Sequence, residues 1–310
     1  MTIFPKQNVN PKTLGILALC SAIYLLIVGL LVGLKTENYV IILCYTFFFL
    51  LSDTTRKFVA AFTIFIVFGI VYDLMKAFPN YTIHSVDIMH IYGLEKSLFG
   101  IHLGNLVLTP NEYFAAFRCT FLDFLSGLFY INWMPIPLGL AVFFYIRNKE
   151  QFLHFSLTFL LTNLIGFCIY YIHPAAPPWY IAQYGSVVKF SIPGNPAGLI
   201  NFDKLVHFPV FQSIYSRNSN VFAAMPSLHS AYPVIVLYYA VKNKLGFVNW
   251  IFGLFVLGIW FSAVYSGHHY LLDVIAGSCC AVFGIFVFQY IILKRRVVSN
   301  WLNSYKEYIS

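Results

Sequence analysis

The sequence has few charged side chains for its length. Only 10% of its 310 residues are Asp, Glu, Lys or Arg, whereas soluble domains carry about a quarter. So little charge cannot cover a water-facing surface, which excludes a soluble enzyme, a nucleic-acid-binding module, a disordered chain and a secreted disulfide scaffold. Hydrophobic residues make up 60% of the chain. The composition therefore indicates an integral membrane protein.

Metal-ligand spacings and a cleavable leader are also missing. The six cysteines lie in or beside apolar runs, without a spacing typical of a metal site, so we expect reduced thiols. We predict neither a metal nor another cofactor. Lys12 precedes a full-length apolar run with no small-residue cleavage pattern close behind it, which favours a first membrane span over a signal peptide.

Long apolar runs make up most of the chain. A membrane span needs about 20 mostly apolar residues. Eight runs are candidates, the second and sixth of them short: residues 14–34, 39–51, 58–78, 128–146, 152–172, 226–241, 247–266 and 270–293. The sequence therefore predicts an all-α polytopic membrane protein with about eight transmembrane helices.

The positive charges indicate which way these spans face. With the N-terminus inside, twelve of the nineteen Lys and Arg residues fall in short inner loops and tails. The positive-inside rule favours this orientation. It places two long connections, residues 79–127 and 173–225, on the non-cytoplasmic side, and loops of that length are typically functional.

The two connections differ in composition. Residues 79–127 mix histidines, acidic residues and aromatics in a pattern typical of interfacial helices, which we interpret as a structural cap. Residues 173–225 contain six prolines, which favour stiff turns over a long helix. We divide the chain into N-terminal transmembrane helices (1–78), an interfacial segment (79–127) and a catalytic transmembrane core (128–310).

Two polar clusters stand at the ends of predicted spans, where ionisable residues typically mark function. One surrounds His229 before the sixth span, and the other runs from 265 to 273 between the last two spans, at the same membrane face. On a helix, His269 and Asp273 are four residues apart and share a side, whereas His268 points about 140° away from Asp273. Asp273 therefore selects His269.

These residue types suit phosphoryl transfer. A carboxylate that holds one imidazole nitrogen leaves the other free as a nucleophile, which indicates this role for His269. His229 is then placed to give a proton to a leaving oxygen. One histidine at a membrane interface is more often an anchor, but two such clusters at one face favour chemistry through a phosphohistidine.

The clusters resemble the second and third motifs of the phosphatidic acid phosphatase type 2 superfamily. Its patterns are Pro-Ser-x-His, then Ser-Arg, five residues, His, three residues and Asp; here they read Pro226-Ser227-Leu228-His229, then Ser262, Ala263, His269 and Asp273. Gly166, His173 and Ala263 replace the superfamily's three phosphate-holding cations. A phosphomonoester carries nearly two negative charges and a phosphodiester one, so this loss favours a phosphodiester substrate. The resemblance implies a six-helix catalytic bundle.

A narrower branch has the same substitutions. The chain is similar to the inositol phosphorylceramide synthase family, fungal-type and bacterial, in the string from Pro174 to Tyr180, in 226–230 and in His268-His269-Tyr270 with Asp273. The resemblance implies transfer of phosphoinositol from phosphatidylinositol to ceramide, with release of diacylglycerol. His269 would attack phosphorus, His229 would act as acid and then base, and Asp273 would hold His269.

The substrate pocket is predicted less fully. Residues suited to binding the phosphate or the sugar hydroxyls are Arg217, His268, Lys204, Asn163, His173 and Ser227. A loop salt bridge is an equal alternative for Asp203 with Lys204. We interpret Glu95 and Asp123 as buried structural hydrogen-bonding groups, with inositol contact as the alternative. Trp179 and Tyr180 are expected to anchor at the interface or line lipid grooves.

Several readings stay open. A lipid phosphatase uses the same three catalytic residues with water as acceptor, and a transferase of another phospho-headgroup is chemically equivalent. A non-enzymatic lipid binder or flippase would tolerate changes at both histidines. The site would face the periplasm from a bacterial inner membrane, or the Golgi lumen in a eukaryote. Partners are membrane lipids and not nucleic acid, and the acceptor species and any accessory subunit are left undetermined.

Overall fold

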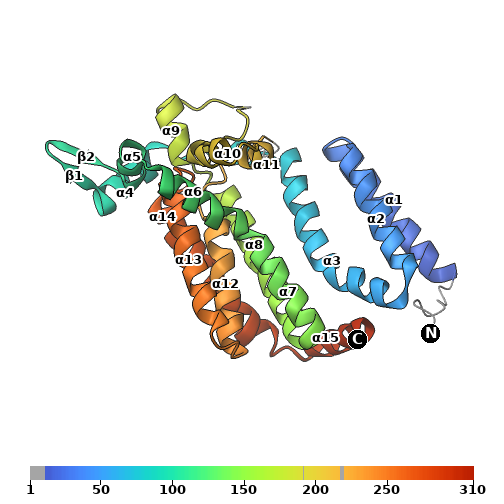
Figure 1. The fold of residues 1–310 in the computed structure, drawn as a ribbon. Helices are drawn as coiled ribbons and strands as arrows, with labels where there is room; N and C mark the ends of the chain where they lie inside the picture. Colours follow the sequence, from blue (N-terminus) through green and yellow to red (C-terminus); the bar gives the residue numbers. More distant parts are fainter. Residues whose placement is uncertain (1–10, 191, 217–219) are drawn as a thin grey trace. The chain divides into compact units, whose positions relative to one another are not determined.

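The computed structural model describes residues 11–190, 192–216 and 220–310, and it is mostly helical (Figure 1). The chain forms two compact units. The first consists of Met1–Phe78 with Arg295–Ser310, and the second is Pro79–Lys294. The predicted site residues that the structure describes all lie within the second unit.

The first unit combines N-terminal helices with the C-terminal helix. They are α1 (Pro11–Leu31), α2 (Thr36–Leu51), α3 (Asp53–Leu74) with the 3-10 turn η1 (Met75–Ala77), and α15 (Arg296–Ile309). Ser52 caps α3, because its hydroxyl accepts the N–H of Thr55 at 3.1 Å. α15 packs on α3, where the Tyr305 hydroxyl donates to the carbonyl of Ala60 at 2.7 Å. Residues 295–310, which we assigned to the catalytic core, thus cluster with the N-terminal helices.

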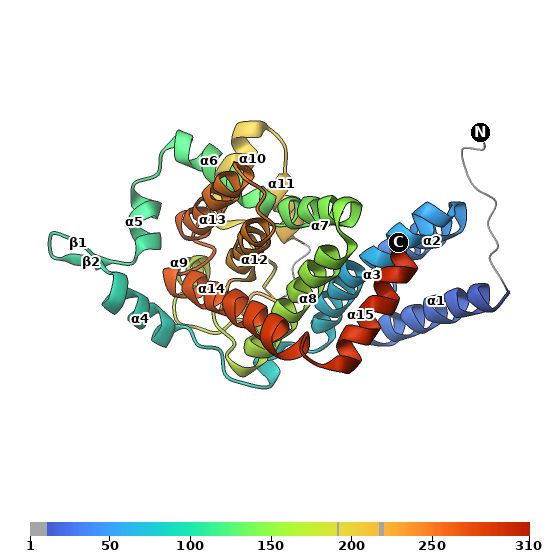
Figure 2. The same cartoon turned by 90° about the horizontal axis from the view of Figure 1, so that it is seen from below.

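The second unit is built around bundled helices. They are α6 (Thr120–Tyr130) with η3 (Ile131–Trp133), α7 (Pro135–Arg147), α8 (Lys149–Ile172), α12 (Leu228–Lys242), α13 (Val248–Tyr265) and α14 (Leu271–Phe286), which the π-helical η5 (Val287–Ile292) continues. α12 is central, since it packs against α7, α8, α13 and α14, and Figure 2 shows these helices around it. Apolar residues along its length are buried accordingly.

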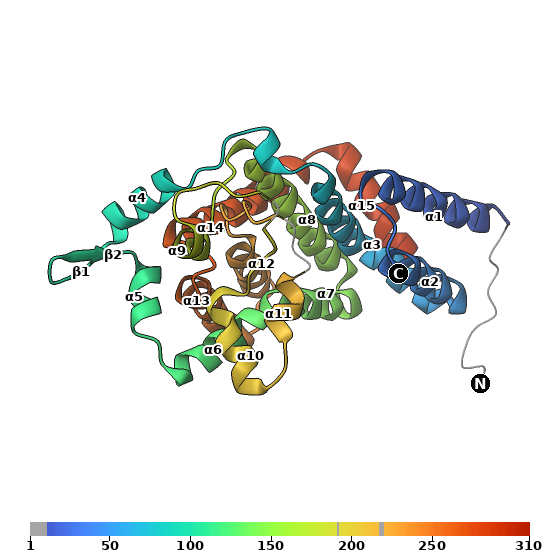
Figure 3. The ribbon, with the colours of Figure 1, turned by 90° about the horizontal axis from the view of Figure 1, so that it is seen from above.

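Short elements gather at one end of this bundle (Figures 1 and 3). They are η2 (Asn80–Thr82), α4 (Met89–Phe99), β1 (Ile101–Leu103), β2 (Leu106–Leu108), α5 (Pro110–Ala116), α9 (Pro178–Tyr184), η4 (Ala197–Leu199), α10 (Ile200–Val206) and α11 (Val210–Tyr215). The two strands form an antiparallel hairpin that the sequence analysis did not predict. In the described part of 173–225 no helix exceeds 7 residues, as the prolines predict.

All eight predicted spans contain a helix, but not all of these helices are long enough. Five are long and apolar enough to cross a membrane: Pro11–Leu31, Asp53–Ala77, Lys149–Ile172, Val248–Tyr265 and Leu271–Ile292. The α6–α7 pair, bent by 42°, makes a sixth. α2 has 16 residues and α12 has 15, short of the about 20 that a span needs. A multi-pass membrane protein is confirmed, whereas a count of eight spans is not.

Candidate active site

A tight turn between α13 and α14 carries two adjacent histidines. Gly267 lies in this turn with a φ of 76°, a left-handed conformation that glycine adopts without strain. The N–H groups of His268 and His269 both donate to the carbonyl of Ala263, at 3.2 and 3.0 Å, so the turn closes over the end of α13. α14 then begins at Leu271. The backbone therefore determines where each imidazole points.

Asp273 faces His269, as their four-residue spacing predicts. Its Oδ2 atom lies 3.5 Å from Nδ1 of His269 and also accepts the N–H of Tyr270 at 2.8 Å. The Asp273 side chain is fully buried. Because 3.5 Å is longer than an ordinary hydrogen bond, a small movement of His269 decides whether the pair is made.

His229 meets this pair from the first turn of α12. Its ring centroid is 5.7 Å from that of His269. Trp133 on η3 packs against His229 nearly edge-on, with ring centroids 4.7 Å apart. Tyr130 on α6 has its ring centroid 5.3 Å from that of His229. The two histidines therefore approach each other inside an aromatic enclosure that restrains the His229 ring.

Main-chain contacts hold the start of α12 to α14. The N–H of Ser227 donates to the carbonyl of Asp273 at 2.9 Å. Gly277 lies one turn further along α14, where an added Cβ would collide with the Ser227 carbonyl. Ser227 also caps α12, because its hydroxyl accepts from the N–H and the hydroxyl of Ser230. The predicted role of Ser227 in substrate binding stays a prediction beside this structural one.

The Pro-Ala-Ala-Pro-Pro-Trp-Tyr string, residues 174–180, contacts both long connections and the histidine turn. Ala175 forms parallel bridges to Asp87 on one side and to Ala223 on the other, so it joins both long connections. The N–H of Trp179 donates to the carbonyl of Gly267 in the histidine turn at 3.0 Å. Trp179 and Tyr180 are buried. Both side chains belong to a buried cluster with Ile88 and Phe222. The expected anchoring at the interface is therefore wrong, whereas the lining of lipid grooves stays a prediction.

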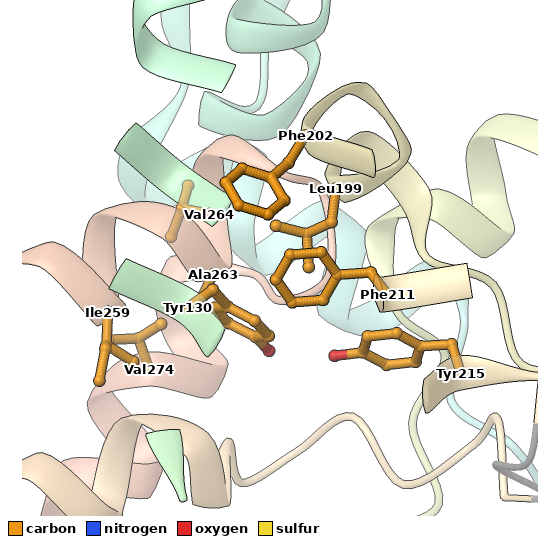
Figure 4. Close-up of a cluster of buried hydrophobic side chains, with 9 residues drawn as sticks. All are labelled: Tyr130, Leu199, Phe202, Phe211, Tyr215, Ile259, Ala263, Val264 and Val274. Atoms are coloured by element: carbon orange, nitrogen blue, oxygen red, sulfur yellow. The ribbon is translucent and has the colours of Figure 1, made fainter. Parts of the chain in front are cut away.

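His268 occupies a separate pocket. Its Nε2 atom lies 2.8 Å from the carbonyl of Pro196, so this nitrogen donates. Its ring stacks on Tyr215 at 4.3 Å and on Tyr130 at 5.8 Å. Figure 4 shows the hydroxyl groups of these two tyrosines pointing toward one another within a buried cluster. His268 thus packs against Tyr130, which also lies beside His229. The predicted contact of His268 with substrate stays a prediction.

Burial lowers the pKa of both histidines in the turn. Loss of hydration, together with the neighbouring His269, lowers the pKa of His268 to about 3. Loss of hydration lowers the pKa of His269 to about 4. Both imidazoles are therefore neutral near pH 7, and the neutral form is the one that a nucleophile needs.

The other predicted substrate residues are spread over the unit. The Asn163 side chain is fully buried on α8, where it accepts from the Tyr232 hydroxyl at 2.6 Å. Lys204 is exposed on α10. His173 is partly exposed, with Nε2 3.4 Å from Asp87 Oδ2, and interacts electrostatically with Asp273. Arg217 lies outside the described residues.

Acidic residues around the site have structural partners. Asp203 accepts the N–H groups of Phe211 and Gln212, at 3.0 and 2.8 Å, and so caps α11. Its carboxylate therefore serves this cap, and the salt bridge suggested with Lys204 is not formed in the described structure. Asp123 pairs with Arg118 at 2.9 Å. Asp123 thus has a structural partner, although it is half-buried and not buried, and inositol contact stays the alternative prediction.

Two positions that carry cations in the superfamily have no room for them. Gly166 packs on Leu228, whose Cδ2 would lie 2.6 Å from an added Cβ. Ala263 is fully buried against the same cluster that holds Tyr130. Both positions are therefore occupied by packed apolar groups in this chain.

Sequence reasoning missed several residues that shape the site. Asn111 binds the backbone of His269, and Trp133 and Tyr130 enclose His229. None has a local signal, because each meets the histidines only through the tertiary fold. Glu95 accepts the N–H groups of Leu271 and Leu272, which confirms it as a buried hydrogen-bonding group.

Comparison with known proteins agrees with this geometry. Residues 115–287, more than half of the chain, match the model of the PAP2 superfamily. The chain belongs to this superfamily, as its two motifs predict.

Individual relatives narrow the resemblance. The chain is 43% identical over 291 residues to the phosphoinositol dihydroceramide synthase of Bacteroides thetaiotaomicron, which covers 93% of this chain and 95% of the relative. It is 28% identical over 260 residues to the inositol phosphorylceramide synthase of Candida albicans, covering 81% of this chain and 51% of the relative. Identity to the catalytic subunit of inositol phosphorylceramide synthase from Saccharomyces cerevisiae is 29% over 251 residues, or 78% and 58% of the two chains. The chain thus spans only about half the length of the fungal relatives. No solved structure matches it significantly.

Proposed function

We propose that the protein transfers phosphoinositol from phosphatidylinositol to ceramide or dihydroceramide through a phosphohistidine intermediate. The observation that carries the proposal is the approach of His229 to the His269–Asp273 pair, with ring centroids 5.7 Å apart. The names of the relatives, above all the one at 43% identity, support this donor and this class of acceptor.

In the first half of the reaction, the neutral His269 attacks phosphorus. Asp273 faces Nδ1, so Nε2 is the attacking nitrogen. The backbone of Ala224 forms a hydrogen bond with this ring, and in the reaction the bound phosphate takes its place. As the new P–N bond forms, the P–O bond to diacylglycerol breaks and His229 gives its proton to the departing oxygen.

In the second half, the acceptor restores the enzyme. His229 takes the proton from the primary hydroxyl of ceramide, whose oxygen attacks phosphorus while the P–N bond breaks. The products are inositol phosphorylceramide and free His269. No net proton is gained or lost, because His229 returns to its starting state.

The shortage of cations supports a phosphodiester donor. Gly166 and Ala263 are packed where the superfamily carries Lys and Arg. The phosphate of a phosphodiester has one negative charge, which the first-turn N–H groups of α12 and His173 suit without a dense basic cradle. We assign the headgroup contacts to His173 and Lys204 and, from the sequence alone, to Arg217. Asn163, Ser227 and His268 stay further candidates beside the structural contacts that they make.

The distribution of positive charge supports a reaction on the non-cytoplasmic face. The positive-inside rule puts the short loops with most of the Lys and Arg residues inside. The turn that carries His269 then faces outward. Diacylglycerol is released into the same membrane.

The test is headgroup transfer by the purified protein in liposomes with inositol-labelled phosphatidylinositol. We expect labelled inositol phosphorylceramide only when ceramide or dihydroceramide is present, and none with His269→Ala. Water-soluble labelled inositol phosphate formed regardless of acceptor would make the protein a hydrolase. Transfer from phosphatidylcholine or phosphatidylethanolamine in preference to phosphatidylinositol would overturn the headgroup.

A further inference from the structure

Two side chains from the first long connection hold the backbone around His269. Glu95 on α4 is fully buried, and its two oxygens accept the N–H groups of Leu271 and Leu272 at 2.9 and 3.1 Å. Asn111 on α5 donates from Nδ2 to the carbonyls of Val264 and of His269 itself, both at 2.8 Å. The backbone is therefore restrained at the carbonyl of His269 itself and at the N–H groups two and three residues after it.

The contacts satisfy groups that the helices leave open. The first N–H groups of a helix have no partner within it, and α14 begins at Leu271. Glu95 accepts from two of these groups, while Asp273 accepts from Tyr270 next to them. A carboxylate at a helix N-terminus is also favoured by the helix dipole. Burial raises the pKa of Glu95, whereas the two backbone N–H groups lower it and so stabilise the carboxylate.

The restraint acts on a distance with little tolerance. His269 Nδ1 and Asp273 Oδ2 are 3.5 Å apart, at the limit of a useful contact. Any rotation of the His269 backbone changes this distance, and Asn111 and Glu95 are the side chains that oppose such a rotation from outside the turn. We propose that Glu95 and Asn111 are positioning residues that set the His269–Asp273 geometry. The first long connection is then a part of the catalytic apparatus and not only a cover.

Variants that keep the size of the side chain test this role. Glu95→Gln places an amide NH2 against one of the two N–H groups, and Asn111→Asp places an acceptor against two carbonyls. The matched control is Glu112→Gln. Glu112 is next to Asn111, but it contacts Thr109 and Tyr92 within its own connection.

The activity readout rests on the proposed function. We expect kcat for inositol phosphorylceramide formation to fall about tenfold to a hundredfold in Glu95→Gln and Asn111→Asp, since misplacement of a reacting group by a fraction of an ångström costs this much. KM for phosphatidylinositol should stay within about twofold, because the substrate contacts are elsewhere. Glu95→Asp keeps the charge and should retain an intermediate kcat, and Glu112→Gln should match the wild type.

A second readout does not need turnover. The rate at which diethyl pyrocarbonate carbethoxylates His269, measured by peptide mass spectrometry, reports how accessible this ring is in the turn. His154 on α8 is the internal reference. Faster modification of His269 alone in both variants supports the inference. Unchanged modification, or acceleration of both histidines together, overturns it. A wild type without transfer activity would sink the proposed function while the modification rates still decide this inference.

Discussion

At the scale of single residues, a neutral His269 ring lies beside the buried carboxyl group of Asp273. That carboxyl group has no exposed surface, so a charge on it would be poorly screened by water. In the proposed mechanism, His269 gains positive charge as it bonds to phosphorus, and an ionised Asp273 would stabilise that charge. His229 lies between the rings of Tyr130 and Trp133 and has no ion pair with a carboxylate in the described part of the chain, which suits its proposed exchange of a proton with oxygen.

Asp273→Asn should abolish most of the activity while the fold survives. The amide oxygen can still accept the N–H of Tyr270, so the cap of α14 is retained. The charge beside His269 is lost, and we expect a decrease in kcat of about a thousandfold or more, as for catalytic triads that lose their carboxylate. Initial transfer rates and thermal unfolding should be measured together. Asp53→Asn, which removes an exposed carboxylate from α3, is the control. An Asp273→Asn variant that keeps more than a tenth of the wild-type transfer rate would contradict the proposed support of His269 by Asp273.

The pKa of His269 predicts an unusual response to acid. The ring has a pKa of about 4, whereas a solvated histidine titrates near 6.5. Transfer rates, taken within seconds of a pH jump, should therefore hold from about pH 7.5 to about pH 5.5, where a solvated histidine would be mostly protonated.

The stability of the fold should also depend on the protonation of these histidines, but its loss should appear only after long exposure to acid. The unfolded chain binds protons at His268 and His269 more tightly than the native chain does. Their contribution to stability is complete above about pH 6.5 and is lost as the pH falls toward about 4. Long incubation at pH 5 should thus inactivate the protein although brief exposure does not. An acid limb of the initial rate centred near pH 6.5 would show that His269 is solvated.

At the scale of elements, the site depends on the join between α12 and α14. The hydrogen bond from Ser227 to the Asp273 carbonyl and the close packing of Gly277 bring the two helices together by main chain. His229 and His269 stand on either side of this join. Their separation is therefore a property of helix packing.

Gly277→Ala should separate the two histidines. The new methyl group collides with the Ser227 carbonyl, so α12 must move away from α14. We expect a loss of about 1–3 kcal/mol in the free energy of unfolding, as for other overpacked cores, together with a larger loss of transfer rate than of stability. Gly253→Ala on α13 is the matched control, because nothing lies within 4 Å of its added Cβ. Equal behaviour of the two variants would rule out the join as the determinant.

The sequence predicted those elements whose cause is local. Apolar runs predict the helices, and the four-residue spacing predicts that His269 faces Asp273. The pair is found although His269 lies in the turn before α14 and not on the helix. The partners of the turn are not local: Glu95 is 176 residues from Leu271, and Asn111 is 158 residues from His269. The hairpin of β1 and β2 was also missed, although its Gly104-Asn105 turn is a pair typical of two-residue hairpins.

At the scale of the whole molecule, the arrangement is that of a multi-pass membrane protein with its site at one end of a helix bundle. The elements at this end come from both long connections, which residue Ala175 joins through its two bridges. The candidate site therefore depends on both long connections as well as on the bundle.

Labelling of single cysteines tests the orientation of the chain. All six native cysteines are free thiols, so a cysteine-free background is the starting point. We expect Asn105→Cys, in the exposed hairpin turn, to react with an impermeant maleimide in sealed right-side-out vesicles. Ser310→Cys, at the C-terminus, should react only after permeabilisation. The reverse pattern would place the site on the cytoplasmic face.

The main-chain join between α12 and α14 also has a consequence for how this fold diversifies. Amide and carbonyl groups are common to every amino acid, so the Ser227–Asp273 hydrogen bond survives most substitutions of the side chains around it. The fungal relatives share fewer than a third of the aligned residues with this chain. A join made by main-chain atoms does not depend on which side chains those are, so it can persist through such divergence.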